Sequence, residues 1–137
     1  MKLRTVRRRG PNGPHRDDRG FASAEFAVLA VVILALVFSA IQVGLYFHAR
    51  KVAQSAARQG VESGRQFASS PSDGVAQAQI YLARFGGSVR GASVTSSGSS
   101  AEEVRITVRG SVATLVPGLE LTVTQHAEAP IERWTTP

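Results

Sequence analysis

The sequence predicts an α+β fold with a long N-terminal transmembrane helix that continues outside the membrane, a second short helix, and a small antiparallel sheet of about three strands. Three observations support this prediction. Residues 26–47 form an uninterrupted apolar run. Residues 48–85 are rich in helix-forming side chains, with one serine- and proline-rich interruption near residue 70. After Gly86-Gly87 the apolar residues recur at every second position, which is the period of a strand.

The apolar run from Phe26 to Phe47 is long enough to cross a bilayer, which needs about 20 apolar residues. It holds fourteen Leu, Ile, Val or Phe residues. At about −0.3 to −0.6 kcal/mol each, these residues favour insertion by about 4 to 8 kcal/mol. Glu25 lies at the edge of the run, where it costs less than the roughly 3 kcal/mol of the bilayer centre. We therefore expect insertion, and the alternative is a buried core helix of a soluble domain.

The net charge of +6 is concentrated before this run. Residues 1–20 carry seven basic and two acidic side chains, whereas the rest of the chain nearly balances. Because positive flanks stay on the cytoplasmic side, residues 1–20 are expected to form a basic cytoplasmic leader and the C-terminal part to be extracytoplasmic. The arginines that set this orientation are Arg7, Arg8, Arg9, Arg16 and Arg19. Binding of nucleic acid or anionic lipid by the first three is the alternative, and no nucleic-acid partner is expected.

No residue cluster in the sequence indicates an active site. The chain has no cysteine, which excludes disulfides, thiol catalysis and cysteine-ligated metal. Its three histidines, His15, His48 and His126, are far apart in the sequence. A glycine-rich phosphate loop, a nucleophile elbow and a well-placed pair of acids are also missing from the sequence. We therefore expect a protein that is not an enzyme, with no catalytic residue, cofactor, metal or small-molecule substrate.

The long helix is expected to span the membrane over residues 21–48 and to continue outside it over 49–70, ending near Ala68. A small extracytoplasmic domain is expected over 71–137. Small residues recur along the helix, and such a ridge lets another backbone approach closely. The same ridge would also suit packing against the sheet of this chain. The helix-packing positions predicted from the ridge are Gly44, Ala56, Gly60 and Gly64.

In the small domain, Ser72 or Asp73 is expected to cap a second helix that Gly86-Gly87 ends. A strand is expected over 89–95, with Ala92 and Val94 on one face and Gly91 as a possible bulge.

Two further strands alternate apolar and polar residues, over 104–112 and 119–128. If their hairpin closes on Pro117-Gly118, Val112 lies opposite Val123 and Arg109 opposite His126. A type II Pro-Gly turn, however, fits the twist of a hairpin poorly. Residues 130–137, which include Trp134, are expected to form an edge or docking segment.

The segment from Arg19 to Phe26 resembles the processing site of type IV prepilins: a basic leader that ends in Gly20, a glutamate five residues later and a long apolar helix. The Glu25-Phe26 pair, Gly44 followed by two aromatic residues, and the AARQG run over 56–60 are similar to TadE-like minor pilins of the Flp/Tad branch. The resemblance covers about residues 19–64. Family members often have a proline early in the span and an acid near the Gln42 position, and this chain has neither.

The resemblance implies a reduced pilin-type fold and cleavage between Gly20 and Phe21 by a prepilin peptidase. Glycine, which has no Cβ, suits the close fit of a backbone into a cleft. Cleavage leaves a new ammonium on Phe21, one helical turn from Glu25. Because a carboxylate in apolar surroundings needs a partner, the resemblance implies that Glu25 pairs with the Phe21 ammonium of a neighbouring subunit, and that Glu25 and Phe26 act in processing and assembly.

The partners that the resemblance implies are the prepilin peptidase, other pilin subunits, the pilus assembly platform and the membrane. The expected location is the cell membrane, as a single-pass protein with its N-terminus in the cytoplasm, and a cell-surface pilus after processing. Two alternatives are an uncleaved single-pass signal-anchor that presents a small external binding module, and a membrane-bound regulator that works through its basic N-terminus.

Overall fold

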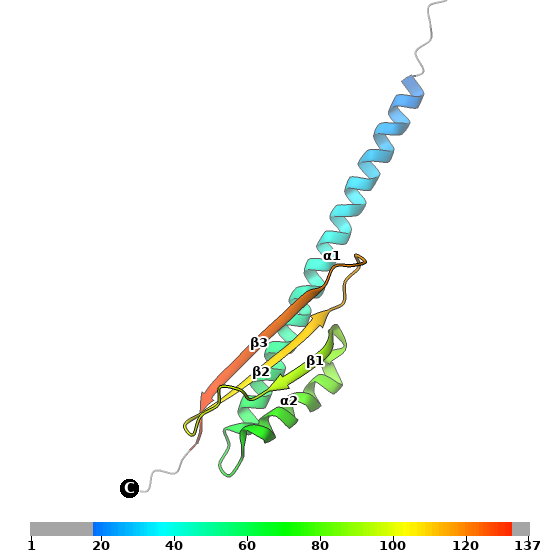
Figure 1. Ribbon diagram of the computed structural model, residues 1–137. Coiled ribbons are helices and arrows are strands. Elements are labelled where there is room, and N and C mark those ends of the chain that lie inside the picture. Colours follow the sequence, from blue (N-terminus) through cyan, green and yellow to red (C-terminus); the bar gives the residue numbers. More distant parts are fainter. Residues whose placement is uncertain (1–17, 133–137) are drawn as a thin grey trace, which may run out of the picture. The chain divides into compact units, whose positions relative to one another are not determined.

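A computed structural model describes residues 18–132 of the chain. Their α+β fold confirms the predicted architecture of a long apolar helix, a second short helix and an antiparallel sheet of three strands (Figure 1). The elements in chain order are α1 (Asp18–Gly64), α2 (Pro71–Phe85), the 3-10 turn η1 (Gly86–Ser88), β1 (Val89–Thr95), β2 (Glu103–Val112) and β3 (Leu121–Pro130).

The chain divides into two compact units, Met1–Ala35 and Leu36–Pro137. In the first unit, the described residues all belong to α1. The second unit holds the remainder of α1, together with α2 and the sheet. The arginines at positions 7, 8, 9 and 16, which were expected to set the orientation, and Trp134 lie outside the described residues.

Helix α1 ends at Gly64, so the prediction that it reaches about Ala68 was wrong. Gly60 and Gly64 are poor helix formers, each about 1 kcal/mol less favourable than alanine. Beyond them, Ala68 takes a left-handed backbone conformation with φ 65°. The Ser69 N–H then donates to the carbonyl of Gln66 at 3.0 Å, so a turn replaces the next turn of helix.

The cap of α2 is Ser70, and the prediction of Ser72 or Asp73 was wrong by two or three residues. Pro71 occupies the first turn, where its missing N–H costs nothing. The hydroxyl and the backbone N–H of Ser70 both donate to the Asp73 carboxylate, at 2.6 and 2.8 Å. These two bonds lower the pKa of Asp73, the hydroxyl having the larger effect. Asp73 therefore completes a capping box instead of being the cap itself.

The sheet is an antiparallel meander in the order β1-β2-β3. β1 has the predicted bounds, and its register shifts between Arg90 and Ser93. Gly91, with φ 57°, lies in this bulge, as predicted. Of the two residues expected on one face, Ala92 is exposed and Val94 is half-buried.

The β2–β3 register differs from the prediction by two residues: Val112 pairs with Leu121, and Arg109 pairs with Thr124. Pro117-Gly118 does form a turn, since the Leu119 N–H donates to the Val116 carbonyl and Gly118 has φ 82°. That turn lies within the longer loop 113–120 and does not join the strands directly. A two-residue shift keeps every side chain on its face, so the predicted inward residues of β2 are the buried ones.

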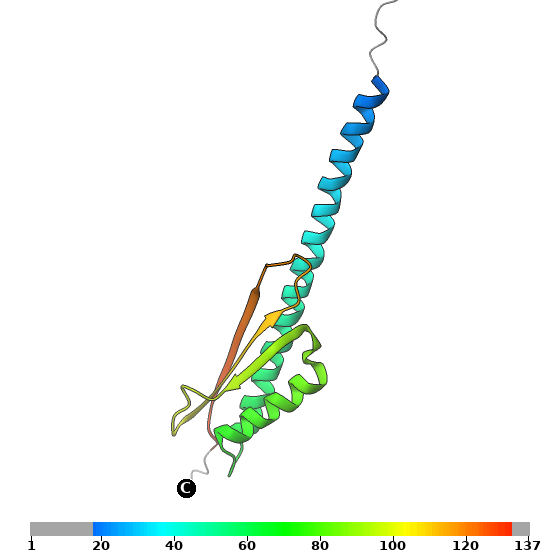
Figure 2. The same ribbon diagram turned by 45° about the vertical axis from the view of Figure 1, so that its right-hand side comes forward.

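Both helices pack on one side of the sheet (Figure 2), and the side chains on its other side are exposed or half-buried. The core joins small residues of α1 to β-branched residues of the sheet. Its members are Ala49, Val52, Ala53, Ala56, Ala57 and Val61 from α1, Ala78 from α2, and Val89, Val104, Ile106, Val108, Val112 and Val123 from the strands.

The segment after β3 returns to the end of α1. The Ile131 N–H donates to the Glu102 carbonyl at 2.9 Å, and the Glu132 N–H donates to the Arg65 carbonyl at 3.0 Å. The Arg65 guanidinium lies 2.9 Å from Glu62 and 3.4 Å from Glu132. Its hydrogen bond lowers the pKa of Glu62. Residues 131–132 thus dock on the body of the domain.

Candidate functional site

The predicted cleavage site lies in the first turns of α1. The helix begins at Asp18, so the backbones of Gly20 and Phe21 are helical. The first four amides of a helix have no intrahelical acceptor, and glycine is a weak helix former. The peptide bond between Gly20 and Phe21, the predicted cleavage site, therefore lies in a turn of the helix with few intrahelical hydrogen bonds.

Glu25 is exposed on α1 and lines a shallow groove with Ala24, Val28, Leu29 and Val32. Glu25 is the one Asp, Glu, Lys or Arg between positions 23 and 49. None of the side chains described in residues 23–132 forms a salt bridge with it. A carboxylate in such apolar surroundings needs a counter-charge or water. Phe26, the other residue of the predicted motif, is 76% exposed.

From Phe26 to Ile41 the large apolar side chains of α1 are all exposed. The share of each side chain that is exposed is 66% for Val28, 57% for Leu34 and 65% for Leu36. The most apolar stretch has a mean hydropathy of 2.8 and is 6% buried, and the helix is long and apolar enough to cross a membrane. A core helix of a soluble domain would be covered by its own chain. That alternative does not fit this helix.

The predicted helix-packing residues fall into two groups. Ala56, Gly60 and Gly64 are buried by other parts of the same chain. A Cβ added to Gly60 would lie 2.7 Å from the Gly74 carbonyl oxygen of α2, so the two helices touch backbone to backbone. Gly44 is exposed, with no atom within 4 Å of the position its Cβ would take, and its role in contacts between subunits stays a prediction.

Sequence reasoning missed a contact between the end of the apolar run and the β2–β3 loop. The Gln42 side-chain amide donates from Nε2 to the Ala113 carbonyl at 3.4 Å, and its Oε1 accepts from the Leu115 N–H at 2.9 Å. Gln42 is the one amide side chain in the run 26–47. A polar residue within an apolar helix was the available signal, but its partner is 71 residues away in sequence.

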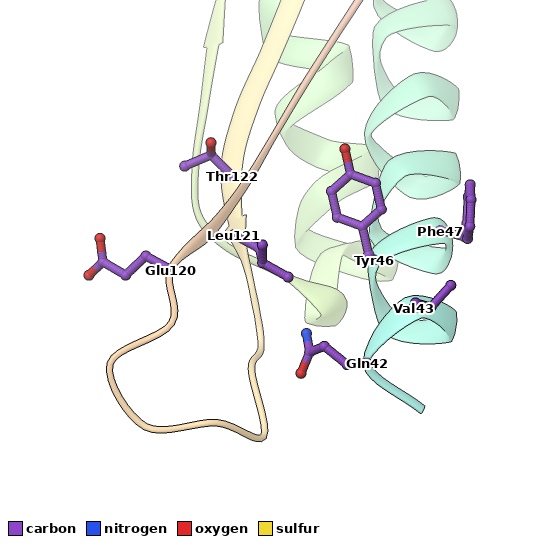
Figure 3. Close-up of a pocket in the computed structure, with 7 residues that line it drawn as sticks. All are labelled: Gln42, Val43, Tyr46, Phe47, Glu120, Leu121 and Thr122. Carbon is purple, nitrogen blue, oxygen red and sulfur yellow. The ribbon is translucent and has the colours of Figure 1, made fainter. Parts of the chain in front are cut away.

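A groove of about 480 Å³ lies beside this contact, between α1 and the start of β3 (Figure 3). Leu121 points toward the helix, whereas Glu120 and Thr122 point away from it. The groove lining is mostly apolar. Its residues are Gln42, Val43, Tyr46, Phe47, Glu120, Leu121 and Thr122.

The two described histidines, His48 and His126, do not form a metal site. His48 and His126 are both exposed, and His15 lies outside the described residues. Within the part of the chain that the structure describes, no three His, Asp or Glu side chains are close enough to share a metal ion. Arg109 does not face His126, because Thr107 takes that place in the register.

Comparison with known families gives one match. The family model described as TadE-like protein matches residues 20–62. This range begins at the predicted cleavage glycine, includes the apolar run and stops just before the end of α1. No curated protein and no solved structure matches the chain.

Proposed function

We propose that this chain, whose residues 20–62 match the TadE-like family model, is a minor pilin or pseudopilin of the Flp/Tad pilus system. A prepilin peptidase removes its leader after Gly20, and the processed subunit takes part in assembling a Flp-type pilus or a related secretion apparatus. The role is structural, not enzymatic. The observation that carries this proposal is an apolar helix with almost no cover from its own chain, in the segment that matches the family.

The orientation follows from the charge distribution. The basic leader stays in the cytoplasm because of its five excess positive charges. The sheet and α2 then lie outside the cytoplasm. Processing removes the leader and leaves α1 as a membrane-spanning stem whose N-terminus is the Phe21 ammonium.

In the processed protein, Glu25 aligns the α1 helix of one subunit with that of its neighbour. At about 4 Å and an effective dielectric constant near 20, an ion pair gains about 4 kcal/mol before the cost of desolvation. Glu25 is exposed, with apolar side chains around it, so the Phe21 ammonium of a neighbouring subunit can reach it. Such a pair would set the stagger between adjacent stems in the assembly.

The proposal is tested by the N-terminus of the protein in membranes of cells that contain the peptidase. We expect Phe21 as the first residue of the mature protein. Gly20→Leu should abolish cleavage, because the added side chain occupies the space that the cleft leaves for a bare backbone.

Gly44→Leu is the matched control, since Gly44 lies on the same helix with open space around it, and it should be processed like the parent chain. Intact mass spectrometry distinguishes the two forms. Recovery of Met1 or Lys2 on every copy of the parent chain would overturn processing and leave a single-pass anchor.

A further inference from the structure

The loop between β2 and β3, residues 113–120, combines two features that the proposed function does not use. It carries exposed large apolar side chains, with Leu115 47%, Val116 51% and Leu119 41% exposed. It also has no charged residue before Glu120. Loops that face water ordinarily carry polar turn residues such as Asn, Asp and Ser. This loop has none of these three.

We infer that this loop inserts its apolar tip into the outer leaflet, at the boundary between lipid headgroups and acyl chains. The inference rests on the proposed insertion of α1 in the membrane. The partner that covers the apolar side chains of the loop is the bilayer itself. The loop is hydrogen-bonded to Gln42 of α1, the helix proposed to span the membrane.

The depth of the loop follows from its anchor. Gln42 lies five residues before Phe47, the end of the apolar run, which is about 7.5 Å along a helix. Interfacial apolar segments are buried by about 5–10 Å. The loop residues bonded to Gln42 therefore lie at the depth where apolar side chains contact acyl chains and the backbone still has access to headgroups and water.

The charges on either side agree with this depth. The first basic residues after the run, Arg50 and Lys51, are exposed and follow Gln42 by about 12 Å or more. Glu120, the last residue of the loop and its one charged residue, lines the same groove as Gln42, Val43, Tyr46 and Phe47. On α1 the basic residues therefore begin beyond the end of the apolar run, and Glu120 lies beside the anchor of the loop.

Several backbone N–H positions of the loop need no water as a hydrogen-bond partner. The Leu115 N–H is bonded to Gln42, the Leu119 N–H is bonded to the Val116 carbonyl, and Pro117 has no N–H. Irregular backbone is not tolerated in the hydrocarbon core without partners. These bonds reduce the number of backbone groups that need water. The remaining unpaired backbone groups keep the loop at the interface and out of the hydrocarbon core.

Depth-dependent quenching tests the inference. Because the chain has no cysteine, single cysteines can be placed at Val116, at Ser97 in the loop between β1 and β2, and at Leu34 in the apolar run, each carrying a polarity-sensitive fluorophore. The full chain is reconstituted in phosphatidylcholine–phosphatidylglycerol vesicles that contain lipids with a nitroxide near the headgroup or at mid-chain.

We expect the Val116 probe to be quenched several-fold more than the Ser97 probe, and most strongly by the headgroup-proximal nitroxide. The Leu34 probe should be quenched most by the mid-chain nitroxide. Gln42→Ala in the Val116→Cys background should reduce quenching at Val116, whereas the same change leaves quenching at Leu34 unaltered.

Three results would overturn the inference, and they differ in whether they also refute the membrane-spanning helix. A water-like Val116 probe beside a quenched Leu34 probe refutes loop insertion and leaves the membrane-spanning stem intact. Water-like probes at both positions refute the stem as well. Burial of Val116 that disappears when protein is diluted into excess lipid would assign the loop to a contact between copies of the chain.

Discussion

The two halves of α1 are continuous in backbone and opposite in surface. Between Phe26 and Ile41 the helix carries large apolar side chains that are all exposed. Between Ala49 and Gly64 one face carries small residues that are buried to 0–9% exposure by the sheet and α2. The comparison teaches that helical continuity does not indicate a common environment: the first half needs lipid or other subunits to cover it, and the second half is covered by its own chain.

The largest expected difference between the halves is the response to loss of a large apolar side chain. Ile106→Ala removes a fully buried side chain that packs against the second half, and it should destabilise the domain by about 2–5 kcal/mol. Ile33→Ala, in the first half at 52% exposure, should leave domain stability unchanged. Hydrogen exchange of the β2 amides in detergent micelles measures both. Equal effects would mean that the two halves are covered alike.

A smaller difference is expected when side chains are added. Gly60→Val would place Cβ 2.7 Å from the Gly74 carbonyl oxygen; because that oxygen belongs to backbone, it cannot easily move away, and we expect a loss of about 1–3 kcal/mol. Gly44→Val has open space and should not destabilise the domain. Urea unfolding followed by circular dichroism compares the two variants. A stable Gly60→Val chain would contradict close contact between α1 and α2.

The smallest expected effect concerns the cap of α2, the helix that helps to cover the second half of α1. Bonds from the Ser70 hydroxyl and then from its amide lower the pKa of Asp73. A carboxyl whose pKa is lower in the folded state contributes stability that is complete above its ordinary value of about 3.9 and is lost as the pH falls through the lower folded value.

Asp73→Asn should therefore lower the melting temperature at neutral pH, with the difference from the parent chain shrinking below about pH 4. Glu103→Gln removes one carboxylate outside any helix cap and serves as the control. A difference between the Asp73→Asn and parent chains that is constant with pH would show that the charged cap does not contribute.

Local patterns predicted those elements whose cause lies within a few residues. Gly86-Gly87 ended α2 as expected, and the alternation in β2 identified its buried face before any partner was known. The cap of α2 was misplaced although two local signals indicate Ser70: Pro71 at the first helical position and Asp73 at the capping-box spacing. The register of β2–β3 was misplaced because Pro117-Gly118 supplies a turn without specifying how many residues lie between that turn and the strands.

The candidate site divides in the same way. Gly20, Glu25 and Phe26 were identified from their spacing within one short stretch of the sequence. Their roles in processing and assembly are predictions. The bond between Gln42 and the β2–β3 loop could not be anticipated, because nothing near Gln42 in the sequence indicates which distant backbone it meets.

The sequence by itself determined that α1 is long and apolar enough to span a membrane, since hydropathy is a sum over neighbouring residues, and that the positive charge is concentrated in residues 1–20. Only the tertiary structure decided which small residues of α1 are covered by its own domain and which stay open, and where the apolar β2–β3 loop is held. The physical reason is that close contact depends on the shape of two surfaces brought together by folding. Gly44, Gly60 and Gly64 are the same residue type on the same helix, and only their neighbours distinguish them.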